Sequence, residues 1–280
     1  MELLQAVIMG IVQGLSEFLP ISSSAHLVFS SNLCKILGGL ESSASINQEV
    51  FLDIMLHLGT LIAVLIFFRK DITEILKSVN NSIQTKDYNS KEFKTGMYII
   101  IGTLLTALVA VPLIKVSEYL ITKPEFVGIA LIITGFILLI SEYISKKYTE
   151  KKEISFKTSV LIGLAQGLAS IPGFSRSGLT ISAGLLNGAE RAEAAKYSFL
   201  LSIPVILGAS IIYPIFTLDI KEIQTFNITA IIIGTIISGI VGYLCIKYFL
   251  KFVSKFSLAI FGYYCLVIGI LASVFFTVIK

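Results

Sequence analysis

Long apolar runs with no charged residue constrain the fold of this chain more than any other feature. Residues 127–140, 228–246 and 258–279 contain no Asp, Glu, Lys or Arg. About 20 apolar residues of helix cross a hydrocarbon core roughly 30 Å thick. Only 14% of the whole chain is charged and 55% is hydrophobic, whereas a soluble domain carries about 25% charged residues. The sequence therefore predicts an all-α polytopic membrane protein.

Six segments have the length and hydropathy of membrane spans, and two further regions do not. Regions 1–36 and 157–188 are apolar but are interrupted by Gly, Pro and Ser. Each predicts two short helices joined by a turn at membrane depth, a re-entrant hairpin, which is tolerated where protein buries it or where it lines a wet cavity. The six predicted spans are residues 50–68, 98–114, 126–144, 196–213, 227–247 and 257–279.

The two interrupted regions resemble each other. GIVQGLSEFLPISSSAH (10–26) and GLAQGLASIPGFSRSG (163–178) share Gly-x-x-Gln-Gly-Leu followed by Pro and Ser, and Gln13 and Gln166 are 153 residues apart. Each region precedes three predicted spans. The chain is therefore predicted to contain two repeats, 1–150 and 155–280, that form one integrated membrane domain.

Lysine and arginine are unevenly distributed over the connections between spans. Residues 69–95 carry six of them, 146–157 carry five and 247–255 carry three, whereas 115–125 and 214–226 carry two and one. The positive-inside tendency makes the first three connections cytoplasmic. The first hairpin then enters from outside, the second enters from the cytoplasm, and both termini lie outside. The repeats are thus predicted to be inverted, as in many secondary transporters, whose binding sites lie where broken helices meet.

The first repeated motif concentrates polar groups. Gln13 and Glu17 are four residues apart and share one helix face, and the serines at 22–24 can cap the next helix, with His26 in its first turn. Ionisable residues at membrane depth are costly and usually functional. Glu17 and His26 are therefore candidate catalytic residues, and the helix start is a candidate phosphate site. Ser22 and Ser24 could equally serve only to satisfy backbone groups at the break.

The second motif, PGFSRSGLT (172–180), places Arg176 between Ser175 and Ser177, with Thr180 just beyond. A guanidinium flanked by hydroxyls at a helix start suits phosphate oxygens. Arg176 could also be an internal partner of Glu17, and both interpretations can hold in different states. Together the motifs supply the groups needed for phosphoryl transfer. No Walker loop and no zinc-ligand spacing is present, so nucleotide hydrolysis and zinc are not expected.

Other notable residues are interpreted as structural. His57 is more simply a core histidine than a cavity residue, and Arg191 and Lys196 are expected on a solvated interfacial turn. The net charge of +4 comes without a basic stripe, so no nucleic-acid partner is expected. The N-terminus MELLQAVIMG lacks a cationic segment, so no cleaved signal peptide is expected. Close packing is expected at Gly59, Pro204, Gly208 and the cysteines Cys34, Cys245 and Cys265, which lack CxxC spacing.

The stretches QGLSEFLPISSSAH and PGFSRSG, supported by AEAAKYSFLLSIPVILGA (192–209), resemble the undecaprenyl-diphosphatase family of bacteria, whose members are bacitracin-resistance membrane phosphatases. The resemblance covers essentially the whole chain. It implies hydrolysis of undecaprenyl diphosphate to undecaprenyl phosphate and inorganic phosphate, which recycles the lipid carrier of peptidoglycan synthesis and so supports cell shape. It also implies a multi-pass protein of the cell membrane with an outward-facing site, polyprenyl diphosphate and membrane lipids as partners, and a divalent cation, Mg²⁺ or Ca²⁺. A homo-oligomer is compatible with it.

The resemblance also implies roles for individual residues. Glu17 matches the second acid of the family motif (E/Q)-x-x-x-E and is the candidate metal ligand, while Gln13 occupies the first position and weakens a two-carboxylate metal site. His26 matches the motif histidine, Ser23 the serine proposed as nucleophile, and Arg176 the motif arginine. The choice of nucleophile between Ser23 and His26 stays open. The further phosphate-binding candidates are Gln13, Ser22, Ser175, Ser177 and Thr180.

Two other functions fit part of the pattern. Inverted repeats around a polar midplane would also suit a transporter or lipid flippase that works by alternating access. A non-catalytic membrane assembly protein is the third alternative. Phosphate release by the purified protein in detergent, where no transport is possible, distinguishes the phosphatase from both.

Overall fold

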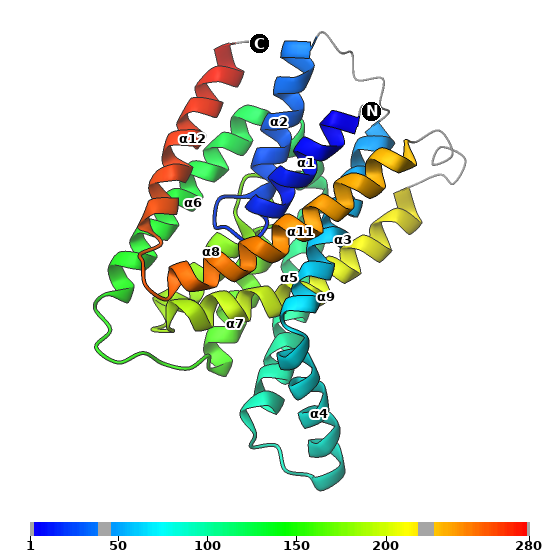
Figure 1. Ribbon diagram of the computed structural model, residues 1–280. Coiled ribbons are helices and arrows are strands. Elements are labelled where there is room, and N and C mark those ends of the chain that lie inside the picture. Colours follow the sequence, from blue (N-terminus) through cyan, green and yellow to red (C-terminus); the bar gives the residue numbers. More distant parts are fainter. Residues whose placement is uncertain (1–2, 39–45, 218–226, 279–280) are drawn as a thin grey trace.

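A computed structural model describes residues 3–38, 46–217 and 227–278, and in those ranges every named element is a helix (Figure 1). An isolated β-bridge between Lys152 and Ala189 belongs to no named strand. The predicted all-α class is therefore confirmed. The helices are α1 (Leu3–Ser16), α2 (Ser23–Gly38), α3 (Ile46–Phe67), α4 (Arg69–Thr85), α5 (Lys91–Ile121), α6 (Pro124–Ser145), α7 (Phe156–Leu168), α8 (Arg176–Leu186), α9 (Arg191–Thr217), α11 (Ile228–Val253) and α12 (Ala259–Val278).

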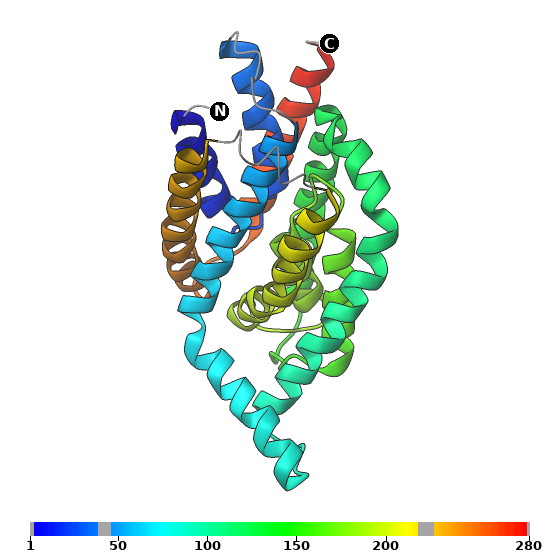
Figure 2. The same cartoon turned by 90° about the vertical axis from the view of Figure 1, so that its right-hand side faces the viewer.

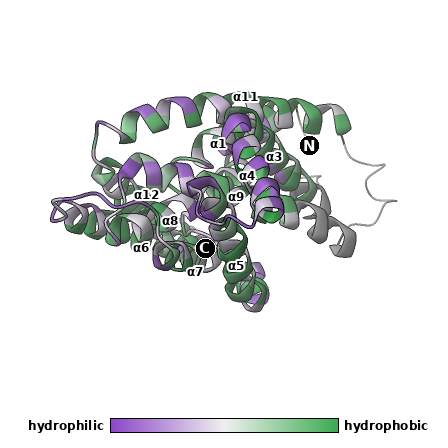
Figure 3. Ribbon diagram, turned by 90° about the horizontal axis from the view of Figure 1, so that it is seen from below, coloured by the Kyte–Doolittle hydropathy of each residue, from purple (hydrophilic) through white to green (hydrophobic). Residues whose placement is uncertain are grey.

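Six of the described helices are long and apolar enough to cross a membrane, as predicted. Large apolar side chains cover their outer surfaces, for example Leu104 and Leu108 on α5, which are 66% and 69% exposed. Figure 3 shows these helices as mainly hydrophobic, with hydrophilic residues gathered on α4 and on the connection before α7. Such a surface suits lipid rather than water. The chain is a multi-pass membrane protein whose candidate spans are Val50–Phe67, Lys91–Ile121, Pro124–Ser145, Arg191–Ser210, Ile228–Val253 and Ala259–Val278.

Two predicted connections differ from the structure. Residues 69–95 contain helix α4, which forms with the start of α5 a hairpin that projects away from the rest of the molecule (Figure 2). Residues 115–125 are mostly helical, because α5 continues to Ile121 and α6 begins at Pro124, where the ring favours a helix start. The predicted connection 214–226 lies largely outside the described residues.

The two interrupted regions each form the predicted pair of short helices. The first motif turn (residues 17–22) joins α1 to α2, and the second motif turn (residues 169–175) joins α7 to α8. Each turn is hydrogen-bonded to the start of the helix that follows the other turn, since Ser177 Oγ of α8 donates to the carbonyl of Leu19 at 2.9 Å and the amide of Gly173 donates to Ser24 Oγ of α2 at 3.2 Å. Segments about 150 residues apart in sequence are thereby brought together.

The glycines of the two motifs pack short helices against spans in the same way. A Cβ added to Gly14 on α1 would lie 2.9 Å from the backbone nitrogen of Gly242 on α11. A Cβ added to Gly167 on α7, the position equivalent to Gly14, would lie 2.9 Å from the carbonyl oxygen of Thr106 on α5. The repeat, its inversion and its boundaries, like the re-entrant nature of the hairpins, stay predictions.

Close packing is confirmed at Gly59, where a Cβ would lie 3.2 Å from the nitrogen of Gly239, but the same prediction is wrong for Gly208, which has no atom within 4 Å of that position. Helix α9 simply presents Gly208 to an open space. Cys245 and Cys265 are buried and free, as a packing role requires. The side chain of Cys34 lies outside the described residues.

Arg191 and Lys196 lie on a partly exposed turn, but both are ion-paired. Arg191 forms an ion pair with Glu142 of α6, whose side chain is almost fully buried, and Lys196 forms one with Asp71 of α4. A buried carboxylate needs a cationic or hydrogen-bonding partner. Helix α9 supplies that partner from its first turn, which fixes α9 against α6.

Candidate active site

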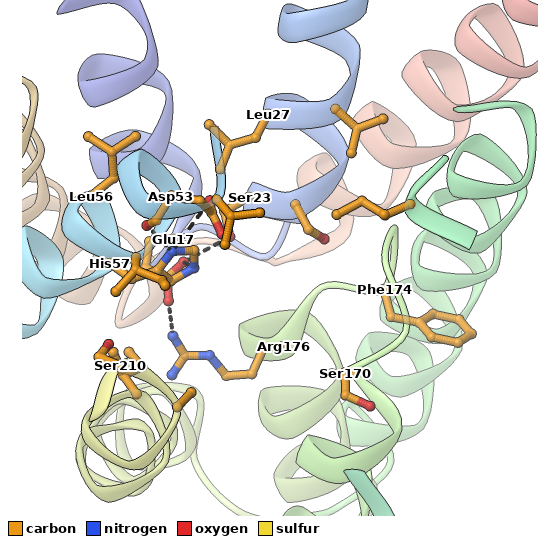
Figure 4. Close-up of a pocket in the computed structure, with 18 of the residues that line it drawn as sticks. Glu17, Ser23, Leu27, Asp53, Leu56, His57, Ser170, Phe174, Arg176 and Ser210 are labelled. Atoms are coloured by element: carbon orange, nitrogen blue, oxygen red, sulfur yellow. Dashed lines mark hydrogen bonds and ion pairs between the residues drawn. The ribbon is translucent and has the colours of Figure 1, made fainter. Parts of the chain in front are cut away.

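A cavity of about 810 Å³ opens where the first motif turn faces α3, α8 and α9 (Figure 4). Its walls are largely apolar, with Met9, Leu27 and Leu56 on one side. A few polar groups converge on it, which is the usual composition of a ligand site. The wall carries Glu17, Asp53, His57 and Arg176, together with several hydroxyls, among them those of Ser23 and Ser24.

Glu17 lies at the centre of these polar groups although its side chain is only 5% exposed. One carboxylate oxygen, Oε1, accepts from Arg176 Nη2. The other, Oε2, accepts from Ser23 Oγ at 2.8 Å and from Gln13 Nε2 at 3.0 Å. The spacing of four residues between Gln13 and Glu17 produces the last contact, as predicted from their shared helix face. The carboxylate thus joins a hydroxyl of one motif to the guanidinium of the other.

Ser23 is the first residue of α2 and follows a sharply bent backbone. Ser22 has a φ of 70°, in the left-handed region that L-residues rarely adopt. Its side-chain oxygen accepts from the amide of Ala25 at 3.2 Å, and this cap starts the helix. The bend directs the Ser23 hydroxyl back to Glu17. Backbone outliers of this kind are concentrated at functional sites.

Arg176 is the first residue of α8, which Ser175 caps by accepting from the amide of Gly178 at 3.0 Å. The guanidinium lines the cavity, and its Nη1 is buried without a hydrogen-bond partner among the described residues. Ser23 and Arg176 therefore both stand at helix N-termini, where the helix dipole and the unpaired amides favour an anion. The expected internal pairing of Arg176 with Glu17 is present, and a donor remains for a ligand.

His26 does not line the cavity. Its Nδ1 lies 2.8 Å from the carbonyl oxygen of Ser22 and its Nε2 lies 2.8 Å from the hydroxyl of Tyr264, on whose ring it stacks. Because a carbonyl can only accept, Nδ1 carries the proton, and in the neutral ring Nε2 accepts from the tyrosine. The Nε2 lone pair that a nucleophilic histidine needs is therefore engaged with Tyr264.

The predicted phosphate-binding hydroxyls of the second motif are buried and bonded within the protein. Ser175 caps α8, Ser177 donates to Leu19, and Thr180 Oγ1 donates to the carbonyl of Arg176 at 2.7 Å and contacts Ser198 Oγ at 2.6 Å. Ser22 caps α2 in the same manner. Ser22 and Ser175 thus cap the two helix starts, Ser177 and Thr180 bond to neighbouring segments, and the contact of all four hydroxyls with phosphate stays a prediction.

His57 and Asp53 were not selected as site residues from the sequence, yet both line the cavity. His57 Nε2 lies 3.6 Å from Glu17 Oε2, so the interpretation of His57 as a core histidine is wrong. A single histidine on an apolar helix does not show which side it presents. The Asp-x-x-x-His spacing, which puts both groups on one helix face, was the available signal.

The second repeat contributes an uncharged polar wall to the same cavity, which the sequence reading also missed. Gln166 donates through Nε2 to Thr106 Oγ1 at 3.1 Å, and the hydroxyl of Ser170 is buried without a partner among the described residues. Gln166 and Ser170 stand 153 residues after Gln13 and Glu17. Gln166 is already paired with Gln13 in the repeat, and extending the alignment by one helical turn pairs Ser170 with Glu17.

The side chains present fit a cation that arrives with the substrate better than a protein-bound metal. Within the described ranges no three His, Cys, Asp or Glu side chains are grouped as metal ligands. Gln13 Oε1, however, is a buried oxygen without a partner beside Glu17, the expected ligand. Amide and carboxylate oxygens suit Mg²⁺ and Ca²⁺, and Mg²⁺ is commonly held by one or two carboxylates together with substrate phosphates.

Comparisons with known proteins identify the family of the chain. The family model described as bacitracin resistance protein BacA matches residues 6–271. Relatives called undecaprenyl-diphosphatase include those of Methanobrevibacter smithii (43% identical, 97% of this chain and 96% of the relative), Methanosphaera stadtmanae (41%, 97% of each) and Halothermothrix orenii (39%, 97% of each). The chain therefore belongs to the bacitracin resistance protein BacA family.

Proposed function

We propose that this chain is a membrane phosphatase that hydrolyses undecaprenyl diphosphate to undecaprenyl phosphate and orthophosphate. The observation that carries the proposal is the carboxylate of Glu17, which binds the hydroxyl of Ser23 and the guanidinium of Arg176 at the wall of one cavity. The names of the relatives support the same substrate. Its product would restore the lipid carrier for cell-wall synthesis, which accounts for bacitracin resistance.

In the first step the terminal phosphate takes the place of Glu17 on Arg176. The Ser23 oxygen attacks the terminal phosphorus, and Glu17, which already accepts its hydrogen bond, takes the proton. The bond from that phosphorus to the bridging oxygen breaks, and the lipid monophosphate leaves with the electron pair. Arg176 and the two helix starts stabilise the charge that develops on the transferred phosphoryl group.

In the second step water attacks the phosphorus of phosphoserine. The bond from phosphorus to the Ser23 oxygen breaks, and Glu17 returns its proton to that oxygen. Orthophosphate leaves with the protons of the water. The serine hydroxyl and the Glu17 carboxylate are then restored, so one carboxylate serves as base and then as acid.

Ser23 is preferred to His26 as nucleophile. The serine hydroxyl faces the cavity and already donates to its base, whereas the Nε2 of His26 is bonded to Tyr264 and His26 lies outside the cavity wall. His26 instead supports the first motif turn, because its ring contacts the Ser22 carbonyl at the bent residue.

A divalent cation, Mg²⁺ or Ca²⁺, would bind together with the diphosphate. Glu17 and the free amide oxygen of Gln13 are the residues that would hold it. The cation would supply neutralisation of the phosphate charge. Because Gln13 brings no charge, this pair holds a cation less tightly than two carboxylates would.

We infer that the protein lies in the cell membrane with its cavity open to the outside. Support comes from the basic connections, which gather at the end opposite to the start of α1 and the end of α12 (Figure 1). The positive-inside tendency makes the basic end cytoplasmic. A homo-oligomer is compatible with this arrangement and stays a prediction.

The direct test is release of orthophosphate from a long-chain prenyl diphosphate by the purified protein in detergent with Mg²⁺ or Ca²⁺ present. Glu17→Gln and Arg176→Lys should each lower kcat/KM about 100-fold or more, because each removes transition-state stabilisation. Absence of release by the wild-type protein would contradict the phosphatase.

The second buried ion pair offers matched controls. Glu142→Gln and Arg191→Lys make the same chemical changes in a pair that does not line the cavity. Their folded fraction should keep kcat/KM close to wild type. Equal losses in both pairs would mean that the assay reports stability and not the site. A transporter without phosphatase activity would release no phosphate in any sample.

A further inference from the structure

We propose that Tyr264 of α12 is a positioning residue for the reaction, because its hydroxyl holds His26, and His26 holds the peptide unit from which Ser23 begins. The inference rests on the proposed function and goes beyond it. No described residue of α12 lines the cavity, yet the inference gives this helix the task of aligning the nucleophile.

Two carbonyl groups of the first motif turn are held by adjacent residues of α12, one directly and one through His26. Cys265 Sγ donates to the carbonyl of Pro20 at 3.4 Å. The Tyr264 hydroxyl lies 2.8 Å from His26 Nε2, and His26 Nδ1 lies 2.8 Å from the carbonyl oxygen of Ser22. The two rings stack with 5.7 Å between their centroids and 10° between their planes. Tyr264 thus fixes both the position and the tilt of the imidazole.

These contacts do not depend on the charge of the imidazole. The Ser22 carbonyl can only accept, so Nδ1 carries a proton whether the ring is neutral or cationic. The tyrosine hydroxyl can donate to a bare Nε2 or accept from a protonated one. The hydroxyl therefore holds the ring in both states.

The carbonyl that His26 holds belongs to the peptide unit between Ser22 and Ser23. A peptide unit is planar, so an oxygen that is held in place fixes the plane from which Ser23 begins. Ser22 has a φ of 70°, and such a conformation persists only where surrounding contacts enforce it. The backbone amide of His26 contacts the same oxygen at 3.3 Å, and the imidazole contact is the shorter of the two. Loss of the Tyr264 hydroxyl would loosen the ring and misdirect the Ser23 hydroxyl relative to Glu17.

Helix α12 can support this contact because it packs closely on α6, beside which it lies in Figure 1. A Cβ added to Gly269 of α12 would lie 2.8 Å from the carbonyl oxygen of Gly128 of α6. Helix α6 in turn holds the second motif turn, since Thr134 Oγ1 accepts from the amide of Ser175 at 3.2 Å. The pair of helices therefore bonds to both motif turns and holds them relative to each other.

The test compares two adjacent tyrosines of α12. Tyr264→Phe should lower kcat for prenyl diphosphate hydrolysis about tenfold, the loss of one hydrogen bond, and change KM by less than about threefold, because Arg176 is untouched. Tyr263→Phe removes the same hydroxyl from a side chain that is 62% exposed, and should keep both constants within about twofold of wild type. An unchanged kcat in Tyr264→Phe, or equal losses in both variants, would overturn the proposal.

Substitutions of His26 show whether the hydroxyl acts through the imidazole. His26→Gln removes the donor to Ser22, so adding Tyr264→Phe to it should slow the enzyme by no more than about twofold. His26→Asn keeps a donor near the former Nδ1, as Asn32 illustrates by donating to the carbonyl four residues before it at 2.8 Å. His26→Asn should therefore be at least about threefold faster than His26→Gln. Losses that multiply in the double variant, or an asparagine variant as slow as the glutamine variant, would contradict the route through His26.

A second measurement needs no turnover. The chain has two histidines, so NMR of the protein labelled with ¹⁵N-histidine in detergent resolves their ring nitrogens, and His26→Gln identifies those of His26. Tyr264→Phe should move the Nε2 signal of His26, and Tyr263→Phe should leave it in place. An unmoved signal in Tyr264→Phe would overturn the proposal even if the protein releases phosphate. Absence of phosphate release by the wild type would instead contradict the proposed function, so the two failures are distinguishable.

Discussion

Two opposing effects act at Ser22: its side chain caps α2 and stabilises the helix, whereas its positive φ strains the backbone. Ser22→Ala removes the cap and keeps the strain, so it should lower the free energy of unfolding by about 1 kcal/mol. Ser22→Gly removes the same hydrogen bond but relieves strain of roughly 1 kcal/mol. Thermal unfolding in detergent should find the glycine variant at least as stable as the alanine variant. A Ser22→Gly variant less stable than Ser22→Ala would show that the backbone at Ser22 is not strained.

Ser23 is expected to carry the covalent intermediate. Rapid acid quenching during turnover, followed by mass spectrometry, should find one phosphate on Ser23, and Ser23→Ala should abolish both the adduct and phosphate release. His26→Gln should keep the adduct on Ser23, because His26 lies outside the cavity wall. A phosphate on His26 would exclude the proposed mechanism.

Sequence reasoning succeeded at some residues and failed at others for a physical reason. Glu17 and Arg176 could be predicted, because a charged residue inside an apolar segment costs free energy and is usually functional. Ser175 is predicted as a phosphate ligand and caps α8 in the structure, so its contact with phosphate stays a prediction. A hydroxyl at a helix start suits backbone and ligand alike, and the pattern cannot tell them apart. His57 was missed because its orientation depends on how α3 packs.

The short helices depend on glycine for their position against the spans. Gly14→Ala would place a Cβ 2.8 Å from the carbonyl oxygen of Ser238 and 2.9 Å from Gly242 on α11, so it should destabilise the protein by more than 1 kcal/mol. Gly208→Ala is the matched control, with open space around its Cβ, and should be neutral or stabilising by up to about 1 kcal/mol. Thermal unfolding in detergent measures both, and equal effects would contradict the packing.

Helix order was easier to predict than helix ends. All six candidate spans follow from hydropathy, because a membrane demands about 20 apolar residues whatever the tertiary structure. Helix α5, however, continues beyond its apolar stretch at both ends, from Lys91 to Ile121. Its start is determined by the cap at Ser90, which accepts from the amide of Phe93, and caps are weak signals beside a long apolar run.

The orientation of the whole molecule can be tested by labelling. A single cysteine at Thr122 or Lys123, in the short connection between α5 and α6, should react with an impermeant thiol reagent applied to intact cells. A cysteine at 86–90 should react only after the cells are opened. Cys34→Ser removes one native thiol, and Cys245 and Cys265 are buried. The opposite pattern would reverse the predicted orientation and leave the chemistry unchanged.

At the scale of the whole molecule, two turns that are distant in sequence come together. The sequence suggested that the two segments are related, and helix packing explains why they meet. The repeat linked Gln13 to Gln166, but it could not show that Glu17 and Arg176 would touch. That contact arises because glycine lets α1 lie close against α11, and α7 against α5, so both turns reach the centre. The site therefore exists only when both halves are in place.

The claim that the two turns form one catalytic unit is tested most directly by a double-mutant cycle on kcat/KM for prenyl diphosphate hydrolysis. Residues that act as a unit are strongly non-additive. Glu17→Gln combined with Arg176→Lys should therefore be no more than about threefold slower than the slower single variant. Losses that multiply, so that two 100-fold effects give about 10,000-fold, would show that the two residues act independently and would contradict a single site.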